Sequence, residues 1–194
     1  MRLREYQVES LSAIYAELAR PAPEPGLIVL PCGMGKTVIF TRAGKDLAAA
    51  GWRPLFMVNR NDLVQQTVEK FWATDPTLRV GVIQGERNEI YGTDVVIASV
   101  QSLSQKRLEK IPPGRFNVLF PDEAHYSAAE SWQRVFKHFA PAPIVGFTAT
   151  PSRSDEKGLG DTFTKILLQR DLVIARCIAG GRLGLQKDTH GVQL

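Results

Sequence analysis

Cysteine is scarce in this chain, which has 2 among its 194 residues, Cys32 and Cys177. Two thiols exclude a disulfide-stapled miniprotein, and they cannot supply the four ligands of a structural zinc site by themselves. Long apolar runs are absent too, because runs such as 27–30 and 95–98 are far shorter than the roughly 20 residues of a membrane-spanning helix. The first twenty residues carry charges throughout and have no apolar block, so they do not resemble a signal peptide. We therefore expect a reducing, cytoplasmic setting and no membrane partner.

Neither sign of charge dominates, since 24 Lys and Arg residues stand against 20 Asp and Glu residues, giving a net charge of +4. This mild and evenly spread surplus permits a nucleic-acid partner without requiring one. With 44% hydrophobic and 23% charged residues, the composition is typical of a globular protein and excludes a disordered or collagen-like chain. The length suits one domain with a sizeable core.

Short apolar runs alternate with longer segments of helical periodicity. The runs are 27–30, 55–58, 80–83, 95–98, 118–120 and 144–147, and the expected helices are 5–20, 36–50, 61–73, 99–110 and 128–140. Continuous apolar runs are typical of strands buried on both faces, and helices between strands imply parallel crossovers. The pattern predicts an α/β fold, a three-layer αβα sandwich with a mainly parallel central sheet. Ligands of such sheets bind at the carboxyl ends of the strands.

The first run leads directly into the glycine-rich segment Pro31-Cys32-Gly33-Met34-Gly35-Lys36-Thr37, and a helical pattern follows. Such a turn lets the backbone N–H groups of residues 32–37 point at one anion, near the positive end of a helix dipole. Lys36 would add a charge for the β and γ phosphates of a nucleotide, and Thr37 a hydroxyl ligand for Mg²⁺. The alternative is a tight turn in which the glycines only relieve strain, because the strict phosphate-loop pattern has a glycine where this chain has Leu30.

A second polar segment, Asp122-Glu123-Ala124-His125, follows the run 118–120. Carboxylates at the end of a buried strand can hold Mg²⁺ and orient an attacking water, and we assign the first role to Asp122 and the second to Glu123. Alone, these residues could simply cap a helix. Together with the phosphate loop they predict a site for ATP and Mg²⁺, in which Lys36, Asp122 and Glu123 are the catalytic residues.

In combination, these segments resemble the first RecA-like domain of superfamily-two helicases of the DEAD/DEAH type, which has a phosphate-loop NTPase fold. The resemblance runs from Leu3 to about Arg153, most of the chain. It implies that the segment around Gln7 recognises adenine. In that case Gln7 contacts the edge of the base, and Arg4 and Tyr6 lie near its ring.

The same resemblance implies contacts with a nucleic-acid strand. Segments 58–66 and 98–103 match the family's strand-binding motifs, and both follow expected strands, so they could contact a sugar-phosphate backbone without distinguishing bases. The expected contacts are Arg60, Gln66, Ser99 and Gln101. The residues expected to couple the ATP state to these contacts are His125, Thr148 and Thr150. The expected partner is DNA rather than RNA.

The chain departs from the family in two respects. Pro121 stands before Asp122, where it removes a hydrogen-bond donor from the end of a central strand. The family also has a second RecA-like domain, which supplies an arginine finger, and too few residues follow Thr150 to build one. We expect residues 1–155 to form the ATP-binding domain and 156–194 to complete it or to form a truncated linker to a missing second domain. The chain would then be a truncated product or one partner of a split enzyme, whose second domain another chain could supply.

Such a chain is expected to bind ATP–Mg²⁺ weakly and to hydrolyse it slowly by itself. Two alternatives remain open at this point. One is a non-catalytic nucleotide- or strand-binding module derived from a helicase. The other is a small phosphate-loop kinase, a class that normally keeps the first glycine of the loop.

Overall fold

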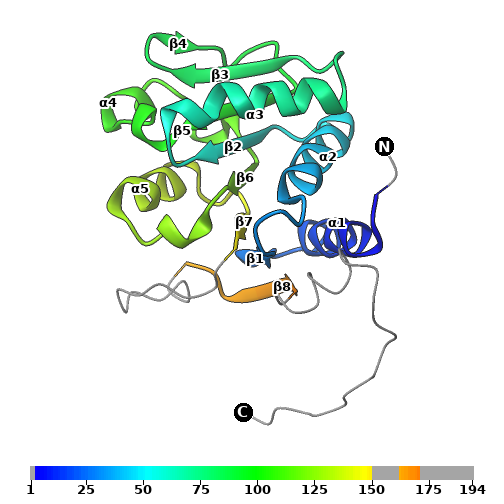
Figure 1. Ribbon diagram of the computed structural model, residues 1–194. Helices are drawn as coiled ribbons and strands as arrows, with labels where there is room; N and C mark the ends of the chain where they lie inside the picture. The colour runs from blue at the N-terminus through cyan, green and yellow to red at the C-terminus, as the bar shows by residue number, and fades with distance from the viewer. Residues whose placement is uncertain (1–2, 150–161, 171–194) are drawn as a thin grey trace, which may run out of the picture.

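The computed structural model describes residues 3–149 and 162–170 (Figure 1). The helices are α1 (Glu5–Leu18), α2 (Lys36–Ala49), α3 (Asn61–Thr74), α4 (Gln105–Leu108) and α5 (Glu130–Phe139), with the 3-10 turns η1 (Val100–Ser102), η2 (Pro113–Arg115) and η3 (Ala124–Tyr126). The strands are β1 (Gly26–Val29), β2 (Pro54–Val58), β3 (Val80–Gln84), β4 (Arg87–Asn88), β5 (Val95–Ser99), β6 (Val118–Pro121), β7 (Val145–Thr148) and β8 (Lys165–Gln169). Each apolar run of the sequence therefore forms a strand.

The strands form a mainly parallel sheet with helices on both sides (Figure 1). The hydrogen-bonded ladders have the orders β4-β3-β5-β2-β6 and β7-β1-β8. Within the described residues the pairs are parallel, apart from the antiparallel pair of β3 and β4. The bridges Leu119–Ile144 and Asp122–Phe147 join β6 to β7 and connect the two ladders. The predicted α/β fold with a mainly parallel sheet is confirmed.

Pro121, the last residue of β6, lies where the two ladders meet. Two residues earlier, Leu119 donates its N–H to the oxygen of Pro143, just before β7. Residues two apart in a strand face the same neighbour, so Pro121 lacks the N–H that would continue this ladder. Asp122 then donates its N–H to the oxygen of Met57 on β2 at 2.8 Å. The proline therefore interrupts one ladder, while Asp122 remains attached to the sheet.

Apolar side chains pack on both faces of the sheet, which gives three layers. The core on the side of α1, α2 and α3 is centred on five phenylalanine rings whose neighbouring centroids lie 4.3 to 6.3 Å apart: Phe40, Phe56, Phe71, Phe120 and Phe147. Full burial of one such ring contributes about 1.5–3 kcal/mol. Successive side chains of strand β2 point to opposite faces of the sheet: Phe56 belongs to this core and Met57 to the core beneath α5.

One expected helix is wrong. Residues 99–110 form η1 and α4, which are separated by Ser104 in an extended conformation, with φ −65° and ψ 159°. Serine side chains compete with the helical backbone for hydrogen bonds, and here the hydroxyls of Ser99 and Ser102 bond to each other at 2.8 Å. The interrupted path still buries Leu103 and Leu108 in the core beneath α5.

Strand β8, late in the chain, joins the sheet beside β1. Gly26 lies opposite Lys165 and Val29 opposite Gln169, so the two strands run parallel.

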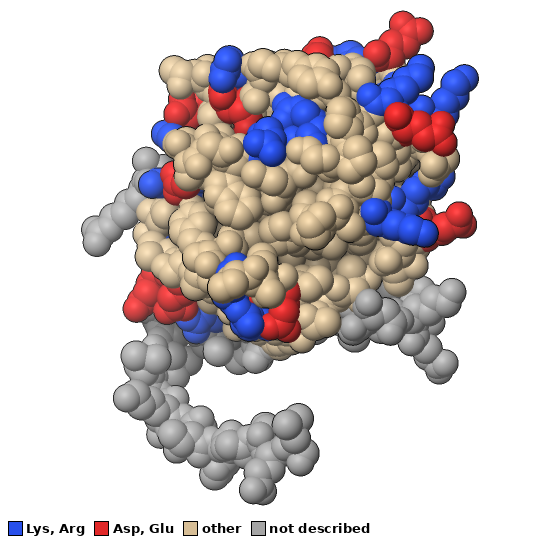
Figure 2. Space-filling model, turned by 180° about the vertical axis from the view of Figure 1, so that it is seen from behind, with Lys and Arg blue, Asp and Glu red and all other residues tan. Residues whose placement is uncertain are grey.

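Among the described residues, no helix has the length and apolar character needed to cross a membrane. On the face seen from behind, basic and acidic side chains mix around the edge and uncharged residues fill most of the centre (Figure 2). That face agrees with the evenly spread charge of the sequence.

Candidate nucleotide and nucleic-acid sites

The phosphate loop connects β1 to α2 at the carboxyl edge of the sheet. Gly33 and Gly35 have φ values of +80° and +72°, and Gly35 is the N-cap of α2. Residues with a Cβ rarely adopt this left-handed backbone, so glycine permits the loop to turn directly into the helix. The N–H groups at the start of a helix generally lack partners within the helix and are the donors that bind anions at such loops. In α2 the N–H of Val38 already donates to the oxygen of Gly35 at 2.9 Å. The segment therefore has the expected strand–loop–helix form.

Lys36 and Thr37 open α2 directly after this loop. The Lys36 ammonium donates a hydrogen bond to the backbone oxygen of Leu30 at 3.1 Å, so the side chain extends back across the loop to the end of β1. Within the loop, Met34 is buried and Cys32 is exposed. The loop backbone and the Lys36 ammonium thus lie together, and their contacts with a nucleotide stay predictions.

The first turn of α1 packs against the phosphate loop. The Tyr6 hydroxyl donates to the backbone oxygen of Met34 at 2.8 Å. Gln7 is 4% exposed, and its Oε1 accepts the N–H of Arg4 at 2.9 Å. A Cβ added to Gly35 would lie 2.7 Å from Nε2 of Gln7. The segment expected to recognise adenine therefore touches the loop, while the base contacts of Gln7 and of the exposed Arg4 stay predictions.

The acidic pair follows β6 at the same edge of the sheet. Asp122 accepts the N–H of Glu123 at its Oδ1, at 3.0 Å. Glu123 has a φ of 52°, which for a residue with a side chain costs on the order of 1–2 kcal/mol. Strain of this kind persists where the surrounding structure enforces it, and it is concentrated at functional sites. Here it lets the chain turn from β6 into η3 within two residues, Asp122 and Glu123.

The carboxyl group of Asp122 lies near charges of both signs. Burial raises the pKa of its carboxyl and the charge of Glu123 raises it further, while Lys36 and Lys70 oppose the shift without cancelling it. Asp122, Lys36 and Thr37 line one small cavity of about 20 Å³. Hydroxyl and carboxylate oxygens are ligands that Mg²⁺ accepts, usually together with substrate phosphates. The Thr37 hydroxyl and the Asp122 carboxylate therefore fit an ion that is shared with a nucleotide.

His125 links the acidic segment to the end of β7. Its Nδ1 lies 3.2 Å from Oε2 of Glu123 and 3.4 Å from Oγ1 of Thr148. Thr148 is fully buried. The two segments that the resemblance assigns to coupling are thus in contact, although the coupling itself stays a prediction. Thr150 lies outside the described residues.

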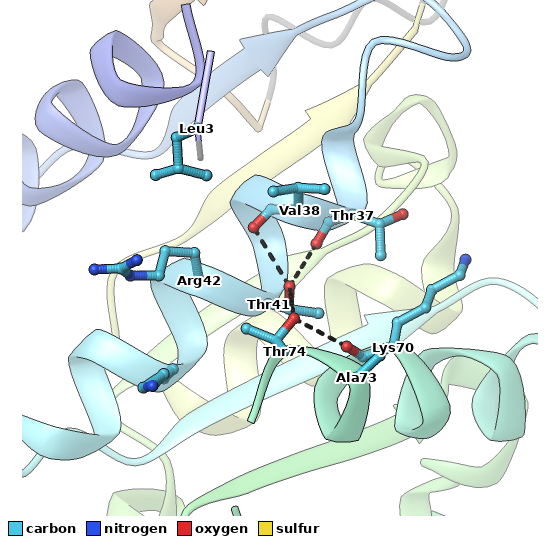
Figure 3. A pocket seen from close by; sticks show the side chains of 9 residues that line it. Leu3, Thr37, Val38, Thr41, Arg42, Lys70, Ala73 and Thr74 are labelled. Atoms are coloured by element: carbon cyan, nitrogen blue, oxygen red, sulfur yellow. Dashed lines mark hydrogen bonds between the residues drawn. The ribbon is translucent and has the colours of Figure 1, made fainter. Parts of the chain in front are cut away.

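A larger cavity of about 350 Å³ lies beside the start of α2 (Figure 3). Its lining comes from α2, from α3 and from a residue two positions before α1: Leu3, Thr37, Val38, Thr41, Arg42, Lys45, Lys70, Ala73 and Thr74. This volume is within the range of small-molecule sites. Thr37 and Lys70 line both this cavity and the smaller one, so the two cavities adjoin.

The two segments expected to contact nucleic acid lie side by side, because β2 and β5 are neighbours with Val58 opposite Ser99. The Ser99 hydroxyl donates to Oδ1 of Asn61, and Nε2 of Gln101 donates to the backbone oxygen of Asn59. Ser99 is fully buried. Its observed role is therefore to join the two segments, and a direct contact between Ser99 or Gln101 and a strand stays a prediction.

Arg60 and Gln66 come from the beginning of α3. Both are exposed, and Arg60 forms an ion pair with Asp62 at 3.0 Å between two solvent-facing side chains. Ion pairs between exposed side chains contribute little to folding stability, so Arg60 can exchange Asp62 for a phosphate. Its contact with nucleic acid, and that of Gln66, stay predictions.

Two side chains of these sites were not identified from the sequence. Asn61 binds Ser99 across neighbouring strand ends, and Lys70 lines both cavities. Both depend on elements that are distant in the sequence, so no local motif indicates them.

Comparisons with known proteins show which family this chain resembles. A family model described as the type III restriction enzyme, res subunit, matches residues 1–153. One relative is IRC3 of Saccharomyces cerevisiae, which is named as an ATP-dependent helicase. It is 30% identical over 185 aligned residues, which cover 88% of this chain and 27% of the relative. The DNA 3'-5' translocase XPB2 of Sulfurisphaera tokodaii is 30% identical over 160 residues, covering 81% of this chain and 33% of the relative. The chain thus spans about a third or less of the length of these relatives.

The fold also matches solved structures. The SWI2/SNF2 ATPase core of Sulfolobus solfataricus, solved in complex with dsDNA, gives a TM-score of 0.68 at 18% identity, over 84% of this chain and 35% of that one. At this level of identity, the similarity shows a shared fold.

Proposed function

The chain belongs to the family of the type III restriction enzyme res subunit, and from this membership we propose that it is the ATP-binding domain of a nucleic-acid helicase or translocase. The observation that carries the proposal is the shared cavity of Lys36, Thr37 and Asp122, which joins the phosphate loop to the acidic segment. The names of IRC3 and XPB2 support it, as does the earlier resemblance to superfamily-two helicases.

The residues divide the work of ATP hydrolysis among them. Lys36 binds the β and γ phosphates, and the loop N–H groups hold the same phosphates from the backbone. Thr37 and Asp122 hold Mg²⁺, which neutralises phosphate charge when bound. Glu123 orients the attacking water. His125 connects Glu123 to Thr148 at the end of β7. Movement along a strand requires that this connection change with the nucleotide state.

The partners follow from the same reasoning. We propose DNA in preference to RNA, because XPB2 is named a DNA translocase and the SWI2/SNF2 core was solved with dsDNA. The Asp-Glu-Ala-His sequence favours the DEAH type. A second RecA-like domain, supplied by another chain or another part of the protein, would provide the arginine finger. A cytoplasmic setting is proposed from composition.

The test is the nucleotide-dependent thermal shift of the chain and its Lys36→Ala variant. ATP–Mg²⁺ at 100 times its Kd should stabilise the wild type by about 2.7 kcal/mol, or about 5–10 °C in Tm. Lys36→Ala should abolish this shift. Lys110→Ala, which removes an exposed lysine away from the loop, should keep it. An unchanged shift in Lys36→Ala would contradict the assignment of the phosphate site.

A further inference from the structure

Helices α2 and α3 run side by side in a defined register. The Thr74 hydroxyl donates to Oγ1 of Thr41 at 2.8 Å (Figure 3), and Lys45 pairs with Asp75 at 2.9 Å further along both helices. Residues four apart lie above one another on a helix. One turn back from Thr41 is Thr37, and one turn back from Thr74 is Lys70. The contacts between the helices therefore place Lys70 opposite Thr37, in the first turn of α2.

The cavities agree with this register. Lys70 lines the small cavity together with Lys36, Thr37 and Asp122, and it also lines the larger cavity beside it. In Figure 3 its side chain extends from α3 toward the level of Thr37. Its positive charge acts on Asp122, where it opposes the rise in pKa that burial causes. Lys70 is therefore part of the nucleotide site in space, although it lies 34 residues from Lys36 in the sequence.

Lys70 also differs from the other cations of the larger cavity. Arg42 pairs with Asp46 at 2.8 Å, and Lys45 pairs with Asp75. Within residues 3–149 and 162–170, the structure gives the Lys70 ammonium neither an ion pair nor a hydrogen bond. Two ammonium groups and one carboxylate around the small cavity leave an excess of positive charge. Such an excess suits a polyphosphate anion.

We propose that Lys70 binds a phosphate oxygen of the nucleotide, as a second ammonium group beside Lys36. The inference rests on the proposed function and adds a contact from α3 to it. The same helix begins with Arg60 and Gln66, the residues expected to contact nucleic acid. Phosphate binding by Lys70 would therefore place the nucleotide and the strand on one rigid element.

The test measures the Kd of ATP–Mg²⁺ by isothermal titration calorimetry at constant ionic strength. Lys70→Gln should weaken binding about tenfold, the effect of losing one charged hydrogen bond. Lys70→Arg, which keeps the charge, should restore most of the affinity. Lys110→Gln, the matched change of an exposed lysine, should bind like the wild type. Thermal unfolding without nucleotide should be the same for all of them, because Lys70 is exposed and unpaired.

The outcomes separate this inference from the proposed function. If Lys36→Ala loses binding while Lys70→Gln keeps wild-type affinity, the role of Lys70 is refuted and the phosphate site stands. If Lys70→Gln weakens binding of single-stranded DNA but leaves the Kd of ATP–Mg²⁺ unchanged, Lys70 is a strand contact and the inference is again refuted. If the wild type binds no ATP–Mg²⁺, both proposals fall.

Discussion

Alanine substitutions of the two loop glycines separate backbone strain from a side-chain clash. Gly33 and Gly35 both have positive φ, so alanine at either position incurs about 1–2 kcal/mol of left-handed strain. A Cβ on Gly33 meets nothing within 4 Å, whereas a Cβ on Gly35 lies 2.7 Å from Nε2 of Gln7. Gln7 is buried, so it must move and lose its hydrogen bond from Arg4, which adds about 1 kcal/mol. Gly35→Ala should therefore destabilise the protein more than Gly33→Ala.

Thermal unfolding measures the difference directly. For a protein of this size about 1 kcal/mol corresponds to about 2–4 °C, so Gly35→Ala should melt that much below Gly33→Ala. The difference should vanish in a Gln7→Ala background, because the side chain that meets the new Cβ is gone. The shift induced by ATP–Mg²⁺ should also be smaller in Gly35→Ala. Equal Tm values for the two variants would refute the packing of Gln7 against the phosphate loop.

Two further predictions address hydrolysis and strand binding. Glu123→Gln should keep ATP binding, because the amide has the same shape as the carboxylate, and it should remove hydrolysis, because no carboxylate orients the water. Calorimetry measures the binding and phosphate release measures the hydrolysis. Loss of ATP binding would instead show that Glu123 has a structural role. Arg60→Ala should weaken DNA binding with little sequence preference and reduce the salt slope by about 1. Arg79→Ala, at another exposed ion pair, is the control, and an identical slope for Arg60→Ala and wild type would exclude the phosphate contact.

The sequence predicted the sheet because its strands are buried on both faces. Phe56 and Met57 pack into different cores, so both must be apolar and the strand appears as a continuous run. The phosphate loop was predictable for a similar reason, since the backbone at Gly33 and Gly35 requires positive φ. In each case, a local physical requirement determines the residue type.

Features that depend on packing between distant elements could not be predicted in this way. Helical periodicity does not show that Ser104 is extended, because this break between η1 and α4 accompanies the burial of Leu103 and Leu108 in the core beneath α5. The bond between the buried Ser99 and Asn61 joins residues that are 38 positions apart, so no local motif indicates it. Lys70 enters the site through the register of α2 and α3.

Glu17 is a buried acid that connects α1, the following loop and β8. Its carboxylate accepts hydrogen bonds from Lys165 at 2.7 Å, from the N–H of Glu24 at 2.8 Å and from Arg20 at 3.0 Å. Burial alone would raise the pKa of Glu17, but these donors outweigh it and lower the pKa from 4.5 to about 2. The difference corresponds to about 3 kcal/mol. Because Arg20 and Lys165 are each 42% exposed, solvent screening reduces this to about 1–2 kcal/mol.

Glu17→Gln should therefore remove a pH-dependent part of the free energy of unfolding. The folded pKa lies below the unfolded one, so this stabilisation is complete above about pH 5 and is lost as pH falls through 4.5 toward 2. Urea unfolding should show a loss of about 1–2 kcal/mol at pH 7 and a flatter decline in acid. Glu69→Gln, an exposed change on α3, should leave the profile unaltered. If Glu17→Gln costs as much at pH 3 as at pH 7, the loss comes from packing, and the ion pairs do not attach β8.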